Sequence, residues 1–272
     1  MTDSAELLDD LIGEFLKESP IRYRIEANGL EEKRSALRSL MNIRHPAPAS
    51  PELIELQNRY LLARRDEKGI IDEKDIDTID VTLGVRLPHS DRIALWQGDI
   101  TMLRCGAIVN AANAMMRGCF HPGHLCIDNC IHTYAGIQLR LECDRKMKEV
   151  GEGIPNFEWP TSVPMLTESY NLPCESIIHV VGPIASGRLN DTLEKELSDC
   201  YINVLNMCQK YGIRSVAFCC ISTGVFGFPN QRAAEIAVDT VRGWLGSNDG
   251  VDKIIFNVFL DKDRRIYEEL LR

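Results

Sequence analysis

Residues 98–140 read GDITMLRCGAIVNAANAMMRGCFHPGHLCIDNCIHTYAGIQLR. In this stretch an apolar run ends in asparagines, a cluster of cysteines and histidines follows, and an acidic residue then opens a helical pattern. Apolar strands that end in polar residues are typical of the ligand-binding edge of an α/β sheet. The stretch therefore indicates both the fold class and the place of the functional site.

Short apolar, β-rich runs continue on both sides of this stretch, with helical patterns between them. The runs are IALWQ, AIVNA, IIHVVG, VAFCCIS and IIFNVFL. Such runs are typical of strands that are buried on both faces. The alternation predicts an α/β fold in which helices flank a mixed, largely parallel central sheet, and ligands bind outside the carboxyl ends of its strands.

Helical spacing of apolar residues predicts three later helices, over 193–211, 231–245 and 263–271. Asp191 and Glu194 suggest a capping pair at the start of the first of them.

The first 66 residues carry apolar residues at helical spacing in three segments. Ser50-Pro51-Glu52 predicts the start of the third helix, as N-cap, first-turn proline and favourable acid. We predict a small N-terminal helical subdomain over 1–75 and an α/β domain over 76–272. The acidic segment DEKGIIDEKDIDTID is either a connecting loop or a solvated flank, and it indicates no function of its own.

The composition, with 44% hydrophobic and 26% charged residues among 272, is ordinary for a folded protein. The net charge of −9 argues against a duplex nucleic-acid partner. No apolar run approaches the roughly 18–20 residues that a bilayer requires, and the acidic N-terminus does not resemble a secretory signal. We therefore expect a cytoplasmic protein without a membrane partner, in which ten cysteines indicate metal binding rather than disulfides.

Six potential metal ligands lie among the fourteen residues from Cys119 to His132. Zinc takes three or four such ligands in tetrahedral geometry, and a loop interrupted by proline and glycine can fold around it. The spacing is not that of a zinc finger, so a site with three protein ligands and one open position is plausible. Cys130 and His132 are more simply explained as a helix-face cysteine and a core histidine.

Two polar residues near this cluster are candidates for chemistry. Asp128 belongs to the first turn of a helix that we expect to end near Met147, where the helix dipole favours an ionised acid. It is either a capping residue or the group that orients or deprotonates a water molecule. Asn113 follows the strand AIVN, and it either contacts a ligand or, like Asn110, satisfies the backbone of a tight turn.

A glycine-containing loop follows the strand VAFCCI. Its residues are Ser222, Thr223, Gly224, Val225, Phe226 and Gly227. Glycines allow a tight turn that points N–H groups at phosphate oxygens, next to the start of the following helix. The loop has no lysine in a Walker arrangement, which argues against hydrolysis of a nucleoside triphosphate.

With these residues in place, the chain resembles the macrodomain family, specifically its zinc-containing, MacroD-like members. The resemblance rests on GDIT, AIVNAAN, GCFHPGHLCIDNCIH, YNLP, IIHVVGP and CCISTGVFGFP, and it covers about 95–271. It implies the α/β/α sandwich of that family, an ADP-ribose pocket, and hydrolysis of ADP-ribose from modified proteins. The N-terminal helical region also resembles the extension that such proteins carry.

The resemblance also implies a role for each candidate residue. Asp99 and Ile100 would contact adenine, and Phe259 would stack near it unless it packs in the core. The backbone of Ser222, Thr223, Gly224, Val225 and Phe226 would hold the diphosphate, and Asn113 would hold the distal ribose. Cys119, His124 and Cys126 match the zinc ligands of the family in their C-x4-H-x-C spacing.

Charge balance limits the role of the metal. Two thiolates and a neutral imidazole cancel the charge of Zn²⁺, so we expect the ion to orient or polarise the ribose or the ester, while Asp128 handles water or a proton. The expected substrate is mono-ADP-ribose linked as an ester to Asp or Glu. The alternatives are a non-catalytic ADP-ribose reader, an O-acetyl-ADP-ribose deacetylase, and a structural zinc module with Cys130 or His121 as fourth ligand.

One segment departs from the subgroup. The run before YNLP is TSVPML over 161–166, where the subgroup carries a Gly-x-Ala-Lys-like sequence. Pro164 stiffens the start of this strand and predicts an edge position, which bears on substrate preference more than on ADP-ribose binding.

Overall fold

The computed structural model describes residues 4–18 and 29–272; residues 1–3 and 19–28 of the predicted helical region lie outside the description. The chain divides into two compact units. The helical unit consists of Met1–Ile70, Met116–Phe157 and Ser169–Leu172, and the sheet unit of Ile71–Met115, Glu158–Glu168 and Pro173–Arg272. These units follow from packing, and the predicted domain boundary after residue 75 stays a prediction.

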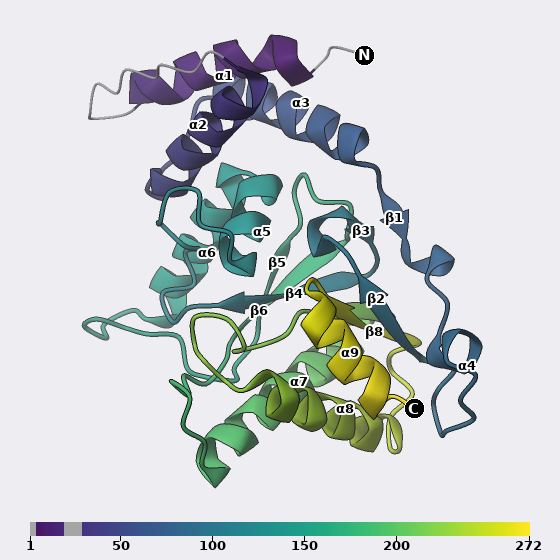
Figure 1. The fold of residues 1–272 in the computed structure, drawn as a ribbon. Coiled ribbons are helices and arrows are strands. Elements are labelled where there is room, and N and C mark those ends of the chain that lie inside the picture. Colours follow the sequence, from purple (N-terminus) through teal and green to yellow (C-terminus); the bar gives the residue numbers. More distant parts are fainter. Residues whose placement is uncertain (1–3, 19–28) are drawn as a thin grey trace. The chain divides into compact units, whose positions relative to one another are not determined.

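Three N-terminal helices confirm the helical pattern predicted for this region. They are α1 (Ser4–Glu18), α2 (Leu30–Ile43) and α3 (Pro51–Lys68), shown at the purple and blue end of the chain in Figure 1. Their apolar faces form one core cluster, in which Leu8 and Leu11 are fully buried. Burial of each such leucine contributes about 1.5–3 kcal/mol. The predicted start of α3 is also confirmed, because Ser50 Oγ accepts the Leu53 N–H at 3.1 Å.

Gly136 separates two further helices of the helical unit, α5 (Ile127–Ala135) and α6 (Ile137–Val150). The prediction of one continuous helix from Asp128 to about Met147 is therefore wrong. Gly136 has a φ of 102°, and a Cβ at this position would lie 2.7 Å from Gln57 Nε2. Both the backbone conformation and the close approach require glycine, so the helix breaks here.

The sheet unit contains a six-stranded sheet in the order β2-β8-β7-β4-β6-β5. All neighbouring strands are parallel except β5, which runs antiparallel to β6. The predicted fold class, a mixed and mostly parallel sheet flanked by helices, is confirmed. The strands are β2 (Ile93–Gln97), β4 (Ala107–Ala112), β5 (Met165–Glu168), β6 (Ser176–Val181), β7 (Ser215–Phe218) and β8 (Lys253–Val258).

The edge position predicted for the strand after Pro164 is confirmed. β5 follows this proline directly and lies at one end of the strand order. Its register with β6 places Met165 opposite His179 and Glu168 opposite Ser176. An edge strand tolerates a proline at its start because one of its sides needs no ladder partner.

Three helices of the sheet unit pack on one another and on the strands (Figure 1). They are α7 (Asp191–Tyr211), α8 (Asn230–Leu245) and α9 (Asp261–Leu270). The N-cap of α7 is Asn190, whose Oδ1 accepts the Leu193 N–H at 2.9 Å, so the predicted Asp191–Glu194 capping pair is wrong. Glu194 instead forms an ion pair with Arg232 at 2.7 Å. No helix in the described part of the chain is long and apolar enough to cross a membrane.

The acidic connecting segment contains short regular elements. They are β1 (Ile71–Asp72), the 3-10 turn η1 (Glu73–Asp75) and α4 (Ile79–Thr82). β1 pairs in parallel with β3 (Leu103–Arg104), which adds a second, two-stranded sheet to the sheet unit.

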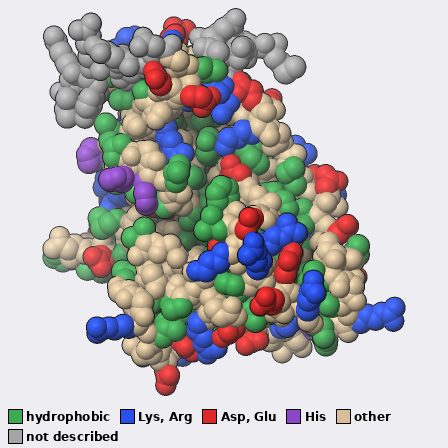
Figure 2. All heavy atoms as spheres, in the orientation of Figure 1, with side chains coloured by type: hydrophobic (Ala, Val, Ile, Leu, Met, Phe, Trp, Pro, Cys, Tyr) green, Lys and Arg blue, Asp and Glu red, His purple; other side chains and the backbone are tan. Residues whose placement is uncertain are grey.

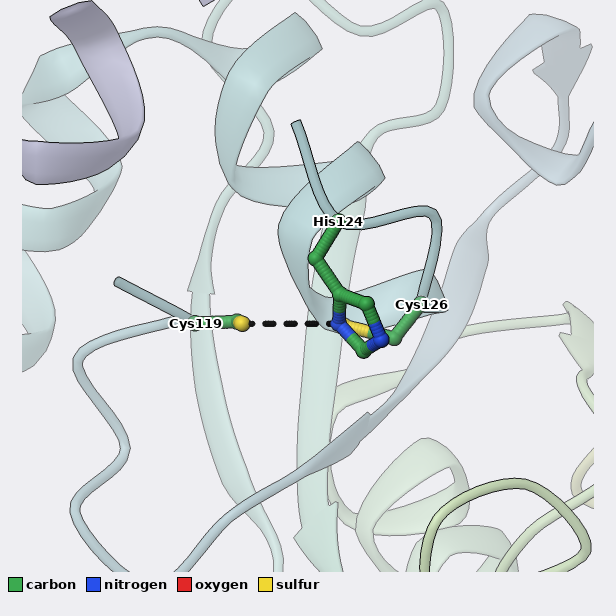
Figure 3. Close-up of side chains that lie close together, drawn as sticks. All are labelled: Cys119, His124 and Cys126. Carbon is green, nitrogen blue, oxygen red and sulfur yellow. Dashed lines mark hydrogen bonds between the residues drawn. The ribbon is translucent and has the colours of Figure 1, made fainter. Parts of the chain in front are cut away.

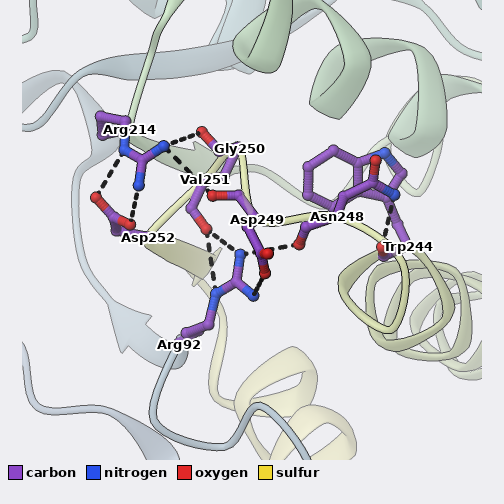
Figure 4. A network of polar contacts seen from close by, with 8 residues as sticks. All are labelled: Arg92, Arg214, Trp244, Asn248, Asp249, Gly250, Val251 and Asp252. Atoms are coloured by element: carbon purple, nitrogen blue, oxygen red, sulfur yellow. Dashed lines mark hydrogen bonds and ion pairs between the residues drawn. The ribbon is translucent and has the colours of Figure 1, made fainter.

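Two arginines hold the turn between α8 and β8 (Figure 4). Arg92 Nε donates to the carbonyl of Val251 at 3.2 Å, and Arg92 Nη2 donates to that of Asn248 at 3.2 Å. Arg214 forms a forked ion pair with Asp252, in which Nε lies 2.8 Å from Oδ2. Because Arg92 precedes β2 and Arg214 precedes β7, these bonds fix the start of β8 between its two neighbours.

The loops that follow β6 and β7 contact each other closely. A Cβ at Gly182 would lie 2.1 Å from Ser222 Oγ and 2.7 Å from Ile221 Cγ2, which no side chain permits. The N–H groups of Ala185 and Ser186 both donate to the carbonyl of Phe226, at 2.9 and 3.0 Å. The conformation of the Ser222 loop therefore depends on glycine at position 182.

Gly182→Ala is expected to lower the free energy of unfolding by about 1–3 kcal/mol, because the added methyl group overpacks the contact with Ser222. Gly243→Ala is the matched control: Gly243 lies in α8, and its Cβ would meet nothing within 4 Å. That control is expected to gain about 0.5–1 kcal/mol by removing a helical glycine. Urea denaturation measures both, and equal unfolding free energies would contradict the role of Gly182.

Asp144 on α6 connects two basic residues of the helical unit. Arg117 Nε lies 2.6 Å from Asp144 Oδ1, and Lys148 Nζ lies 2.7 Å from Oδ2. Burial by itself raises the pKa of the Asp144 carboxyl, but the hydrogen bonds from Lys148 and Arg117 outweigh it and hold this pKa below its usual range.

Asp144→Asn is expected to cost about 1 kcal/mol of stability at pH 7, the upper value for a partly solvated ion pair. Because the folded pKa is lowered, this stabilisation is present above the unfolded pKa of about 3.9 and is lost as the pH falls through the folded value. Denaturation of both proteins at pH 7 and at about pH 3 should show the difference shrinking in acid. A difference that stays constant or grows would count against this pair.

Candidate functional site

The three predicted metal ligands come together in the helical unit. Cys119, His124 and Cys126 each offer one ligand atom, and these atoms lie within 4.8 Å of one another. Cys119 Sγ is 3.6 Å from His124 Nδ1 (Figure 3). A tetrahedral zinc ion with ordinary Zn–S and Zn–N bonds separates its ligand atoms by about 3.6–3.8 Å, so donors and spacing fit zinc. Among the described residues, neither His121 nor Cys130 joins this group.

A turn and a helix start shape the loop that carries these ligands. Gly123 has a φ of 66°, and the His124 N–H donates to the carbonyl of His121 at 3.2 Å. Cys126 is the N-cap of α5, where its Sγ accepts the Asn129 N–H at 3.4 Å. Burial raises the pKa of the Cys126 thiol to about 12, so this sulfur needs a bound cation to ionise at neutral pH.

The loop reaches the surface of the protein. The rings of His121 and His124 meet edge to face with centroids 5.6 Å apart. Figure 2 shows histidine side chains gathered on one part of the face that it draws. His121 is exposed, and Cys119, His124 and Cys126 are half-buried.

Asp128 is a buried acid in the first turn of α5, with 4% of its surface exposed. Its Oδ1 lies 3.6 Å from His132 Nε2, and His132 is itself buried, as predicted for a core histidine. The N-terminus of α5 favours the ionised carboxylate. Burial lowers the pKa of the nearby Arg140 to about 10, and the negative charge of Asp128 partly opposes this shift.

The remaining predicted site residues belong to the sheet unit, where each follows the carboxyl end of a strand. After β2, Asp99 caps the 3-10 turn η2 (Ile100–Met102), and its Oδ1 accepts the N–H and the hydroxyl of Thr101 at 3.0 and 2.6 Å. Ile100 is buried, with 2% exposed. These bonds fix the orientation of the Asp99 carboxylate.

Asn110 in β4 and Asn113, directly after it, have different hydrogen-bond partners. Asn113 Oδ1 accepts the Met115 N–H at 3.0 Å, which is the turn contact that the sequence left as an alternative to ligand binding. Its side chain is half-buried. Asn110 does not serve a turn: it is buried in β4, and its Nδ2 lies 2.9 Å from His179 Nδ1.

The loop after β7 is compact and partly buried. The Phe228 N–H donates to the carbonyl of Ser222 at 3.0 Å, and the Gly227 N–H to that of Gly224 at 3.0 Å. Ser222 has a φ of 64°, and its buried Oγ makes no hydrogen bond within the described part of the chain. Thr223 Oγ1 donates to the carbonyl of Cys220 at 3.0 Å.

Two apolar side chains near this edge face solvent. Val225 of the loop after β7 is 80% exposed, and Phe259, directly after β8, is 72% exposed. Core packing, the alternative explanation for Phe259, is therefore wrong. An exposed aromatic ring after a buried strand is available to stack on a planar ligand.

The structure thus brings the metal ligands together in one unit and places the predicted binding loops along one strand edge of the other. Sequence reasoning did not single out Gly182, because its tight contact is with Ser222, 40 positions later in the sequence. The signal was present as the glycine and proline that end IIHVVGP.

The chain is similar to known proteins in sequence and in fold. The Macro domain family profile matches residues 109–237. A protein-ADP-ribose hydrolase of Treponema medium is 44% identical over 262 residues, 96% of each chain. One from Staphylococcus aureus is 41% identical over 85% of this chain and 82% of its own. The solved Trypanosoma brucei macrodomain in complex with ADP-ribose is 27% identical, with a TM-score of 0.65, over 86% of this chain and 95% of its own. This chain belongs to the Macro domain family.

Proposed function

We propose that this protein is a mono-ADP-ribosyl hydrolase that removes ADP-ribose from modified protein side chains. Its similarity to the Treponema medium hydrolase over nearly the whole of both chains supports this proposal. The observation that carries it is the position of Asp128, a buried acid at the start of α5, two residues after the last of three zinc-type donors. This combination supplies what hydrolysis needs and simple binding does not.

The loops of the sheet unit bind ADP-ribose in this proposal. The backbone N–H groups of Ser222 to Phe226 hold the diphosphate, next to the N-terminus of α8. Asp99 and Ile100 contact the adenine, on which the exposed ring of Phe259 stacks. Asn113, which follows β4 at the same edge, holds the distal ribose.

Cys119, His124 and Cys126 hold one zinc ion in this proposal. When bound, the ion would supply Lewis-acid polarisation to an oxygen of the distal ribose or of the scissile ester. The described residues offer three such donors, the number typical of catalytic rather than structural zinc sites. The proposed ligand set therefore favours a role in the reaction.

Asp128 orients the attacking water and accepts its proton. Asp128 lies in the first turn of α5, where the helix dipole favours the ionised form that a general base requires. Hydrolysis adds the elements of water across the bond between ADP-ribose and the side chain, and it yields free ADP-ribose and an unmodified carboxylate. We propose an ester to Asp or Glu as the substrate, because a carboxylate leaves more readily than the nitrogen of an arginine adduct.

Asp128→Asn is expected to slow release of ADP-ribose from an Asp/Glu-modified protein by about 10²–10⁴-fold, because it removes the general base. Single-turnover release is measured at equal zinc content, with an arginine-linked substrate and O-acetyl-ADP-ribose in parallel. Asp144→Asn, the same substitution on α6, serves as the control for stability. Equal release by native protein and Asp128→Asn would refute the role of Asp128. Tight ADP-ribose binding without release would make the protein a reader.

The purified native protein is expected to contain about one zinc ion per chain, measured by elemental analysis. Cys119→Ser and Cys126→Ser are expected to lose the metal, because serine is a poor zinc ligand. Cys130→Ser is the control, since the Cys130 sulfur lies outside the ligand group of the described residues. Loss of zinc from Cys130→Ser alone would show that the ligand set is wrong.

A further inference from the structure

The metal-ligand loop, residues 119–126, receives hydrogen bonds from α2, a helix far from it in the sequence. Arg38 Nη2 donates to the carbonyl of His124 at 2.8 Å and to Asn129 Oδ1 at 2.9 Å. The same nitrogen lies 3.3 Å from Cys130 Sγ, and Arg38 Nε lies 3.3 Å from Asn129 Oδ1. The Arg38 guanidinium thus joins the His124 carbonyl to two side chains at the start of α5, those of Asn129 and Cys130.

Asn129 extends this contact to the other two ligands. Its Nδ2 donates to the carbonyl of Cys119 at 3.3 Å and to that of His121 at 3.1 Å. Its backbone N–H donates to Cys126 Sγ at 3.4 Å. Each of the three proposed ligands is therefore held by a hydrogen bond from Arg38 or Asn129.

Asn42 holds the turn inside the loop from the same face of α2, four residues after Arg38. Its Oδ1 accepts the Gly123 N–H at 3.0 Å, and its Nδ2 donates to Thr133 Oγ1 at 2.9 Å. Asn42 and Asn129 are 1% and 0% exposed. Buried amides bonded at both ends have one favourable orientation, so they hold the loop in one conformation.

These contacts come from outside the region that the family profile matches. The match begins at residue 109, whereas Arg38 and Asn42 lie in the N-terminal helices. The shared domain therefore contains the ligands and Asn129, while the helices before it supply the groups that fix Asn129 and the Gly123 turn.

We propose that Arg38 is a positioning residue of the metal site, acting through Asn129 and the His124 carbonyl, and that α2 is thereby part of this site. The inference rests on the zinc site proposed above. A metal ion binds more tightly when its ligands are already oriented, and groups that orient ligands from behind affect metal affinity by about 10–100-fold. Without Arg38, the ligand loop loses the bond to the His124 carbonyl and the bonds that orient Asn129, and it keeps the contacts of Asn42 and of Asn129 itself.

Arg38→Met tests the inference, because it keeps the aliphatic stem and removes all four contacts. Arg34→Met is the matched control: Arg34 lies one turn earlier on α2 and pairs with Glu31 and Glu67. Arg38→Lys is the conservative variant, since one ammonium can donate to the His124 carbonyl but lacks the planar fork that also bonds Asn129. All three are made in the full chain.

The zinc dissociation constant is measured by competition with a chromophoric chelator. We expect Arg38→Met to raise it about 10–100-fold, Arg38→Lys to fall between, and Arg34→Met to match the native protein. The cobalt-substituted proteins give a second readout, because the thiolate-to-cobalt and ligand-field bands report the coordination geometry independently of activity. These bands are expected to change in Arg38→Met and to stay native in Arg34→Met.

The outcomes separate the inference from the proposal on which it rests. Native zinc affinity and native cobalt bands in Arg38→Met would overturn the positioning role and leave the zinc site standing. A native protein that binds no zinc would overturn the site, and the inference with it. Circular dichroism of the zinc-free proteins checks folding, and if Arg38→Met is unfolded, native affinity and bands in a folded Arg38→Lys overturn the role.

Discussion

The parallel pairing of β4 with β6 on one side and β7 on the other determines the arrangement of the sheet unit. Two parallel strands cannot be joined by a tight turn, so the chain leaves the carboxyl edge after one of them and returns to the opposite edge before the next parallel strand begins. The segments after β2, β4, β6, β7 and β8 therefore start at one edge. Gln97 and Val258, which end β2 and β8, are opposite each other in the ladder, and this brings Asp99 and Phe259 to the same edge.

The same sheet must satisfy the polar groups that it buries. Asn110 and His179 are opposite each other in the ladder, and both are fully buried. Their side chains bond at 2.9 Å, and Thr167 Oγ1 on the edge strand lies 2.9 Å from the other nitrogen of the His179 ring. This chain of contacts across three strands offsets a desolvation cost that none of the three side chains could meet alone.

The metal-ligand loop has a different source of order. Leu125, between two of the ligands, is 79% exposed, so apolar burial of this side chain does not hold the loop. Hydrogen bonds between main-chain groups of the loop and the side chains of Arg38, Asn42 and Asn129 hold it instead. Such bonds fix direction as well as distance, which suits a loop that brings three potential ligand atoms within 4.8 Å of one another.

The sequence by itself determined the features that depend on neighbouring residues: the buried strands, the helices with their apolar faces, the Ser50 cap, and the C-x4-H-x-C spacing, which places three donors on one short loop. One local prediction was wrong because two neighbouring residues can both cap a helix: Asn190 caps α7, one residue before the expected Asp191. The order of the strands in the sheet could not be read from the sequence. General rules predict only that the carboxyl ends of parallel strands lie at one edge.

Only the tertiary structure decided where helices break and what holds the loop. α5 ends at Gly136, whose φ of 102° is not helical. Gln57, which lies 80 residues earlier than Ile137 in the sequence, occupies the space that a side chain at position 136 would need, and its Oε1 accepts the Ile137 N–H. Arg38 reaches Asn129 across 91 residues. Periodicity and motifs record only what adjacent residues impose on one another. A hydrogen bond between distant segments depends on packing that brings them together, and one chain read in order carries no sign of it.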